Sequence, residues 1–268
     1  MIVNYTGHGG ELGLTQERII DIDQIINWDN KFKLPLFITA TCEFGRFDNP
    51  DLISGGEYVI LNNSGGGIAL LTTTRYVYSH LNYTLNTNFI NTVFEDFNGE
   101  KPTIGDIFLQ TKSLSGTSIN TNKFILLGDP MMKLSYPRHQ IITTEITDTL
   151  SALGKAFFAG EIINVNDSSI IDKFNGIVNI TVYDKEKLVT TLGQESSTPM
   201  PYRQQNNIIY KGKSTVTNGR FTFSFLVPKD IDYTIGNGRI SYYAYHDTEN
   251  MDASGWFEQF YVGGFSNE

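Results

Sequence analysis

The stretch Leu34-Pro-Leu-Phe-Ile-Thr-Ala-Thr-Cys42 decides how the first half of the chain folds. Successive apolar residues place side chains on both sides of an extended backbone, which is typical of a strand in a sheet covered on both faces. The apolar run ends at Ala40, so Cys42 lies just beyond the predicted strand, where functional sites of open α/β sheets collect. Cys42 is the only cysteine of the 268 residues, which excludes an internal disulfide and a multi-cysteine metal site.

A second motif whose residues could take part in catalysis lies upstream of this strand. His8 occurs in Tyr5-Thr-Gly-His-Gly-Gly10, directly after a short predicted strand at residues 1–5. Glycines allow a substrate carbonyl to approach the backbone, and the Gly9 N–H could then face a developing oxyanion. If the two strands are neighbours, His8 and Cys42 converge as base and nucleophile. Taken singly, each has a structural interpretation as well: His8 as a surface residue in a turn, Cys42 as a small buried hydrophobe.

The rest of the first half alternates predicted strands with predicted helices. Asp21 or Asp23 is expected to cap the first helix, and Thr103 another, with Asp106 completing a capping box. This order favours a mainly parallel sheet with helices on both faces. The helices are predicted at residues 21–28, at 82–97 and after Pro102, and the strands at 34–40, 68–73, 123–127 and 132–135, whereas 58–61 forms only a short apolar run.

The pattern changes after residue 137. Helical periodicity disappears, and short alternating segments separated by turn residues predict an antiparallel β-sandwich of the Ig-like kind. We therefore expect an α/β domain over residues 1–137 and a β-sandwich domain over residues 138–268. The strands of the second domain are predicted at 176–183, 187–191, 207–211, 220–227 and 238–245.

Composition and spacing exclude several function classes. The net charge of −9 and the sequence pI of about 4.9 argue against nucleic-acid binding, which needs a basic face. The sequence contains no run of 18 apolar residues for a transmembrane helix and no pattern of a secretory signal. Zinc-ligand spacing, a Gly-x-Ser-x-Gly elbow and a P-loop are also missing, so we expect no metal and no cofactor. Single carboxylates in turns are more typical of caps than of calcium ligands, as at Asp48, Asp51 and Asp129.

Two segments resemble the active-site motifs of gingipain-type cysteine peptidases, peptidase family C25, which have a caspase-like fold. They are Asn4-Tyr-Thr-Gly-His-Gly-Gly10 and Leu36-Phe-Ile-Thr-Ala-Thr-Cys-Glu-Phe-Gly-Arg-Phe-Asp48. Within that family, further segments are similar to the sortase branch of the type IX secretion system. They lie at residues 66–79, 124–134, 174–185, 192–193, 210–213 and 221–230.

The resemblance implies a role for each matching position. Cys42 would be the nucleophile and His8 the general base, and the N–H groups of Gly9 and Cys42 would form the oxyanion hole. Family members also have an acidic residue upstream of the histidine, and none of the seven residues before His8 is acidic. We therefore expect a fragment truncated at both ends, with an incomplete sheet at its N-terminus. Rim residues that contact substrate are expected at Arg75, Tyr76 and Tyr78.

The resemblance also implies substrates, partners and a location. The substrates would be secreted proteins with C-terminal sorting signals, processed through a thioester at the outer face of the outer membrane. Other components of the secretion system and a lipopolysaccharide acceptor would be partners. Two alternatives stay open: a gingipain-like secreted protease that only hydrolyses, and an inactive fragment that serves as a binding module.

Overall fold

The computed structural model describes residues 1–97, 99–194, 197–246 and 248–266. The chain divides into two compact units, Met1–Ser135 and Tyr136–Glu268, each with its own hydrophobic core. Within the described ranges, the helices are all too short or too polar to cross a membrane.

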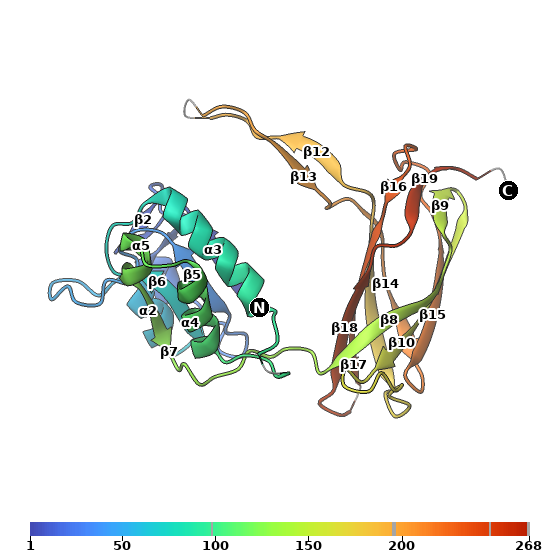
Figure 1. Ribbon diagram of the computed structural model, residues 1–268, viewed down its shortest axis with the longest axis horizontal. Coiled ribbons are helices and arrows are strands. Elements are labelled where there is room, and N and C mark those ends of the chain that lie inside the picture. The colour runs from blue at the N-terminus through green and yellow to red at the C-terminus, as the bar shows by residue number, and fades with distance from the viewer. Residues whose placement is uncertain (98, 195–196, 247, 267–268) are drawn as a thin grey trace. The chain divides into compact units, whose positions relative to one another are not determined.

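The first unit is built on a four-stranded sheet with the order β1-β5-β6-β7 (Figure 1). β1 pairs with β5 and β5 with β6 in parallel, whereas β7 runs antiparallel to β6. The sheet is thus mainly parallel, as the sequence predicts. Its strands are β1 (Ile2–Thr6), β5 (Leu36–Ala40), β6 (Ala69–Thr73) and β7 (Phe124–Gly128).

Helices cover both faces of this sheet, which explains why every residue of β5 and β6 is buried. On one face, Ile38 packs with Phe89 of α3 and Ile107 of α4. On the other, Phe37 packs with Val59 of α2, together with residues of α1. The helices are α1 (Ile22–Ile26), α2 (Gly55–Leu61), α3 (Ser79–Val93), α4 (Ile104–Leu114) and α5 (Ile119–Lys123).

Capping boxes fix where three of these helices begin. Asp21 caps α1 and Thr103 caps α4, and Asp106 closes the capping box of α4, as the sequence predicts. Ser54 caps α2 in the same way, with Glu57 as its partner. These side chains satisfy backbone N–H groups that would otherwise lack a partner in the first turn of a helix.

Two sequence predictions for this unit are wrong in part, and a segment for which the sequence predicts no element forms a helix. The short apolar run at residues 58–61 belongs to helix α2. The long helix is displaced toward the N-terminus, since α3 ends at Val93 and Phe97 forms an isolated bridge with Glu100. Residues 132–135 are not a strand: Lys133 alone forms a bridge there, with Thr103.

A small three-stranded sheet carries the loop that follows β1. Its strands β2 (Gly9–Gly10), β3 (Gly13–Leu14) and β4 (Ile20–Asp21) pair antiparallel, in chain order. The hairpin between β2 and β3 turns at Glu11 and Leu12.

The second unit consists of β-strands. One sheet has seven strands in the order β14-β11-β17-β18-β8-β10-β15, and another has three in the order β16-β19-β9. Most pairs are antiparallel, but β18–β8 and β19–β9 are parallel. The strands are β8 (His139–Ile146), β9 (Thr149–Ala152), β10 (Lys155–Ile163), β11 (Gly176–Tyr183), β14 (Ile208–Val216), β15 (Arg220–Leu226), β16 (Gly236–Asn237), β17 (Arg239–His246), β18 (Asp252–Phe257) and β19 (Tyr261–Phe265).

Stacked aromatic rings fill the core of this unit. Phe158 is fully buried, with its ring centroid 4.8 Å from that of Phe223 and 5.9 Å from that of Phe260. The strands at residues 139–163 that frame this core are missing from the sequence prediction. A separate two-stranded ribbon, β12 (Lys187–Thr190) and β13 (Pro201–Gln204), projects from the sheets of this unit (Figure 1).

Candidate active site

The pairing of β1 with β5 brings the two predicted motifs to one edge of the sheet. The last pair in the parallel register is Thr6 with Ala40, so His8 and Cys42 each follow two residues beyond it. The Gly7 N–H donates to the Ala40 carbonyl oxygen at 3.4 Å, which extends the contact past the strand ends. Neighbouring strands lie about 4.8 Å apart, so the backbone segments that lead to His8 and Cys42 leave the sheet side by side.

Gly9 of the His8 motif lies against Thr41, the residue before Cys42. A Cβ atom at this position would lie 2.6 Å from the Thr41 Oγ1 and 3.1 Å from the Gly13 carbonyl oxygen, so a side chain does not fit without movement. The Thr15 N–H donates to the His8 carbonyl oxygen at 2.8 Å. Because bonded and non-bonded pairs alternate in an antiparallel ladder, the Gly9–Leu14 pair is non-bonded and the Gly9 N–H faces away from β3.

Cys42 is half-buried and carries a free thiol. Its Sγ atom lies 3.8 Å from the Val77 carbonyl oxygen, in the loop after β6. The residue before it is anchored, because the Thr73 hydroxyl donates to the Thr41 carbonyl oxygen. The loop with Cys42 is therefore held against the end of β6, with Cys42 half-buried there.

Glu43, directly after Cys42, has an unusual backbone conformation and little contact with solvent. Its φ of 52° lies in the left-handed region, and the residue is 8 % exposed. Its N–H donates to the Arg75 carbonyl oxygen at 3.4 Å, and its own carbonyl oxygen accepts from the Arg46 N–H at 3.1 Å. The carboxylate raises the pKa of Tyr76, first through its negative charge and then through a hydrogen bond with the phenol.

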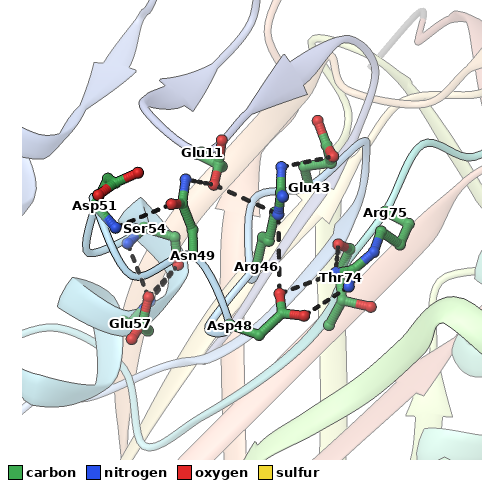
Figure 2. Close-up of polar contacts among 10 residues, drawn as sticks. All are labelled: Glu11, Glu43, Arg46, Asp48, Asn49, Asp51, Ser54, Glu57, Thr74 and Arg75. Atoms are coloured by element: carbon green, nitrogen blue, oxygen red, sulfur yellow. Dashed lines mark hydrogen bonds and ion pairs between the residues drawn. The ribbon is translucent and has the colours of Figure 1, made fainter.

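A cluster of ionic side chains surrounds the loop after Cys42 (Figure 2). The Arg46 Nη1 lies 3.5 Å from Glu43 Oε1, and the Arg46 Nε lies 3.8 Å from both Glu11 Oε1 and Asp48 Oδ1. Two hydrogen bonds, of 3.0 and 2.6 Å, join Arg75 to Asp48. This pairing with Arg75 holds the pKa of Asp48 below its ordinary value.

The three predicted rim residues all follow β6, and their surroundings differ. Arg75 pairs with Asp48, as described above. Tyr76 is 71 % exposed and lies next to Glu43. Tyr78 is the residue before the first turn of α3, and Asn120 donates to its carbonyl oxygen at 2.7 Å. The environment of Tyr76 also includes Cys42.

Sequence reasoning missed the ionic cluster, which joins residues far apart in the chain. A signal was present in the charged spacing Glu43-x-x-Arg46-x-Asp48 directly after the cysteine. Asp48 is an ion-pair partner and not a turn cap, whereas Asp129 caps its turn by accepting from the Met131 N–H at 2.9 Å. Across the described ranges, no three His, Cys, Asp or Glu side chains are grouped so that they could hold a metal ion.

Comparisons with known proteins identify the family of the first unit. The sequence model of peptidase family C25 matches residues 1–135. A search of curated proteins found no match for the sequence.

Among solved structures, the chain is similar to dimeric latent PorU from Porphyromonas gingivalis, with 27 % identity over 76 % of this chain and 20 % of that one, and a TM-score of 0.47. It is also similar to the Arg-specific cysteine proteinase gingipain R, with 16 % identity over 95 % of this chain and 52 % of that one, and a TM-score of 0.46. A complex of Porphyromonas gingivalis RgpB pro- and mature domains gives 14 % identity over 95 % of this chain and 54 % of that one, and a TM-score of 0.45. The chain thus spans a fifth to about half of these chains.

Proposed function

Because the chain belongs to peptidase family C25, a family of cysteine-type peptidases, we propose that Cys42 is its nucleophile and His8 its general base. The observation that supports this assignment most directly is the register of β1 and β5. It sets both residues at the same distance beyond the last strand pair, on one edge of the sheet. A nucleophile and its base must lie within hydrogen-bond reach, and residues that follow neighbouring strand ends are suited to meet this requirement.

The proposed reaction begins with transfer of the Cys42 proton to His8. The thiolate attacks the carbonyl carbon of a peptide bond, and the N–H groups of Gly9 and Cys42 stabilise the oxyanion that forms. The carbon–nitrogen bond then breaks, His8 gives its proton to the leaving amine, and the acyl group remains on sulfur as a thioester. Attack by water yields a carboxylic acid, and attack by an amine yields a new amide.

We assign the second outcome to this chain, as a transpeptidase of the type IX sortase kind. The similarity to PorU over three quarters of the chain supports this assignment. Its substrates would be secreted proteins with C-terminal sorting signals, its acceptor a lipopolysaccharide, and its site of action the cell surface. Other secretion components would be further partners, and Arg75, Tyr76 and Tyr78 would line the substrate cleft. In domain terms, residues 1–137 would be the C-terminal part of a caspase-like catalytic domain and residues 138–268 an Ig-like β-sandwich.

The test uses the single thiol of the chain. A peptidyl electrophile is expected to label Cys42 faster than it labels a free thiol such as glutathione, and His8→Ala is expected to slow the labelling. Equal rates for Cys42 and glutathione, with no effect of His8→Ala, would contradict the peptidase assignment and favour a binding module. Incubation with a substrate peptide and an amine acceptor then separates the two reactions. An acceptor-linked product supports transpeptidation, and a free acid alone supports hydrolysis.

A further inference from the structure

Arg46 connects the two loops on which the proposed chemistry depends. It lies on the loop after β5, which carries Cys42, and its guanidinium reaches Glu11 at the tip of the β2–β3 hairpin. That hairpin begins directly after His8. The same guanidinium lies 3.5 Å from the carboxylate of Glu43, the residue next to Cys42. Figure 2 shows this side chain between Glu11 and Glu43, and these two residues are close in sequence to His8 and Cys42.

The Arg46 guanidinium offsets the negative charges of the carboxylates around it. Three carboxylates, those of Glu11, Glu43 and Asp48, lie within 3.8 Å of Arg46. In the described part of the chain, only Asp48 among them forms an ion pair with a second cation, Arg75. Like charges placed close together repel, and the repulsion is stronger where solvent is partly excluded. The Glu43 side chain is 10 % exposed and that of Glu11 is 18 % exposed. Without Arg46, the negative charges of the two loops would face each other with little screening.

Additional contacts set the place of Glu11 and leave Arg46 as the link to Glu43. The Asn49 Nδ2 donates to Glu11 Oε1 at 2.7 Å, and the Gly55 N–H donates to the Glu11 carbonyl oxygen at 2.7 Å. The Arg46 Nε has no hydrogen-bond partner among the described atoms and lies 3.8 Å from carboxylates of both loops. A planar guanidinium with five donors suits such shared contact better than an ammonium group does.

We propose that Arg46 is a positioning residue that fixes the distance between the His8 hairpin and the Cys42 loop and offsets the carboxylate beside the thiol. This inference rests on the proposed function, because it assigns a task to Arg46 only if His8 acts on Cys42. Its electrostatic part depends on every charged or titratable group around the thiol. These groups are Glu43, Arg46 and Asp48 on the Cys42 loop, Glu11 on the hairpin, Arg75 and Tyr76 after β6, and His8 as the proposed base.

The experiment measures the rate of Cys42 alkylation by iodoacetamide as a function of pH, in the full chain. Since the chain has one cysteine, every alkylated molecule reports this site. In Arg46→Gln, the midpoint of the pH–rate profile is expected to move up by about one pH unit, and the rate at pH 7 to fall about tenfold. Arg46→Lys keeps the charge and is expected to restore the midpoint. Arg203→Gln, at an exposed arginine of the second unit, serves as the matched control and should retain the wild-type profile.

A double-mutant cycle tests the link between the loops. If Arg46 acts through Glu11, the effect of Arg46→Gln should be at most about half as large in a Glu11→Gln background, because residues in one network are not additive. If the effects of Arg46→Gln and Glu11→Gln on the alkylation rate are fully additive, Arg46 does not act through Glu11. The positioning role is overturned if Arg46→Gln and Arg46→Lys lower the alkylation rate equally and also lower the unfolding midpoint equally. Arg46 would then have a purely structural role.

The variant His8→Ala distinguishes failure of this inference from failure of the proposed function. A wild-type profile in Arg46→Gln together with a shifted profile in His8→Ala overturns only the role of Arg46. A wild-type profile in His8→Ala together with a shifted one in Arg46→Gln overturns the assignment of His8 as base, and the positioning role with it.

Discussion

Arg75 and Asp48 face each other across two loops, with Nη1 3.0 Å from Oδ1 and Nη2 2.6 Å from Oδ2. The first loop follows β6 and the second follows β5, so this bidentate pair connects the segment of the predicted rim to the segment of Cys42. Both side chains are nearly half exposed, at 45 % and 46 %. Solvent therefore screens the pair, and its main effect is on geometry.

The pair predicts a pH dependence in the acid range. The pKa of Asp48 is lowered in the folded state, first by the hydrogen bond from Arg75, so the folded state binds this proton more weakly than the unfolded state does. The stabilisation is thus fully present above the unfolded pKa of about 3.9 and is lost as the pH falls through the lower folded value. Asp48→Asn should therefore reduce the fall of the melting temperature between pH 5 and pH 2.

Thermal melts monitored by circular dichroism over this range check the prediction. Asp51→Asn is the matched control, since Asp51 lies in the same loop and has no ion pair among the described residues. Identical acid slopes for wild type and Asp48→Asn would show that the pair does not contribute.

The close packing around Gly9 predicts that a larger residue at this position slows the labelling of Cys42. In Gly9→Ala, the added methyl group would lie 2.6 Å from the Thr41 Oγ1, so the β2 segment or Thr41 must move. Overpacking of this kind costs about 1–3 kcal/mol, and the movement should slow labelling of Cys42 by a peptidyl electrophile about tenfold.

Gly10→Ala is a close control for this substitution, because a Cβ atom at Gly10 has no neighbouring atom within 4 Å. Its labelling rate should remain near that of the wild type. The steric argument is wrong if the two alanine variants are labelled at the same rate.

The aromatic core of the second unit predicts a large loss of stability. Phe158 is fully buried between Phe223 and Phe260, and its replacement by alanine leaves a cavity that close packing does not fill. Phe158→Ala should lower the free energy of unfolding by about 3–5 kcal/mol, measured by urea titration. Phe32→Ala, at a side chain that is 95 % exposed, should change it by less than about 0.5 kcal/mol. A change below 1 kcal/mol in Phe158→Ala would contradict the packing described here.

Local chemistry made parts of this fold predictable. The capping box of α4 could be read from Thr103 and Asp106, because both partners lie within one turn. For α1 the same rule allowed Asp21 or Asp23 as the cap, and the structure uses Asp21. The nearness of the His8 and Cys42 motifs was predictable because consecutive parallel strands end at one sheet edge.

Other parts depend on contacts that no periodic pattern encodes. Residues 58–61 were too short a run to distinguish a helix from a strand, and the cap at Ser54 decides for the helix. In β10, inward positions hold Ala156 and Gly160 while Phe157 points outward, so the alternation of hydropathy is blurred. The contact of Arg46 with Glu11 joins two loops across the sheet edge, and such pairs leave no regular spacing in a sequence.

The backbone conformation of Glu43 and the charge of its side chain have opposite consequences for a substitution at this position. A non-glycine residue with φ near 52° costs roughly 1–2 kcal/mol, which Glu43→Gly would recover in part. The same exchange would remove the carboxylate that meets Arg46 and Tyr76 beside the sulfur. Selection for heat resistance would thus weigh a relaxed backbone at this position against the loss of the ion pair with Arg46.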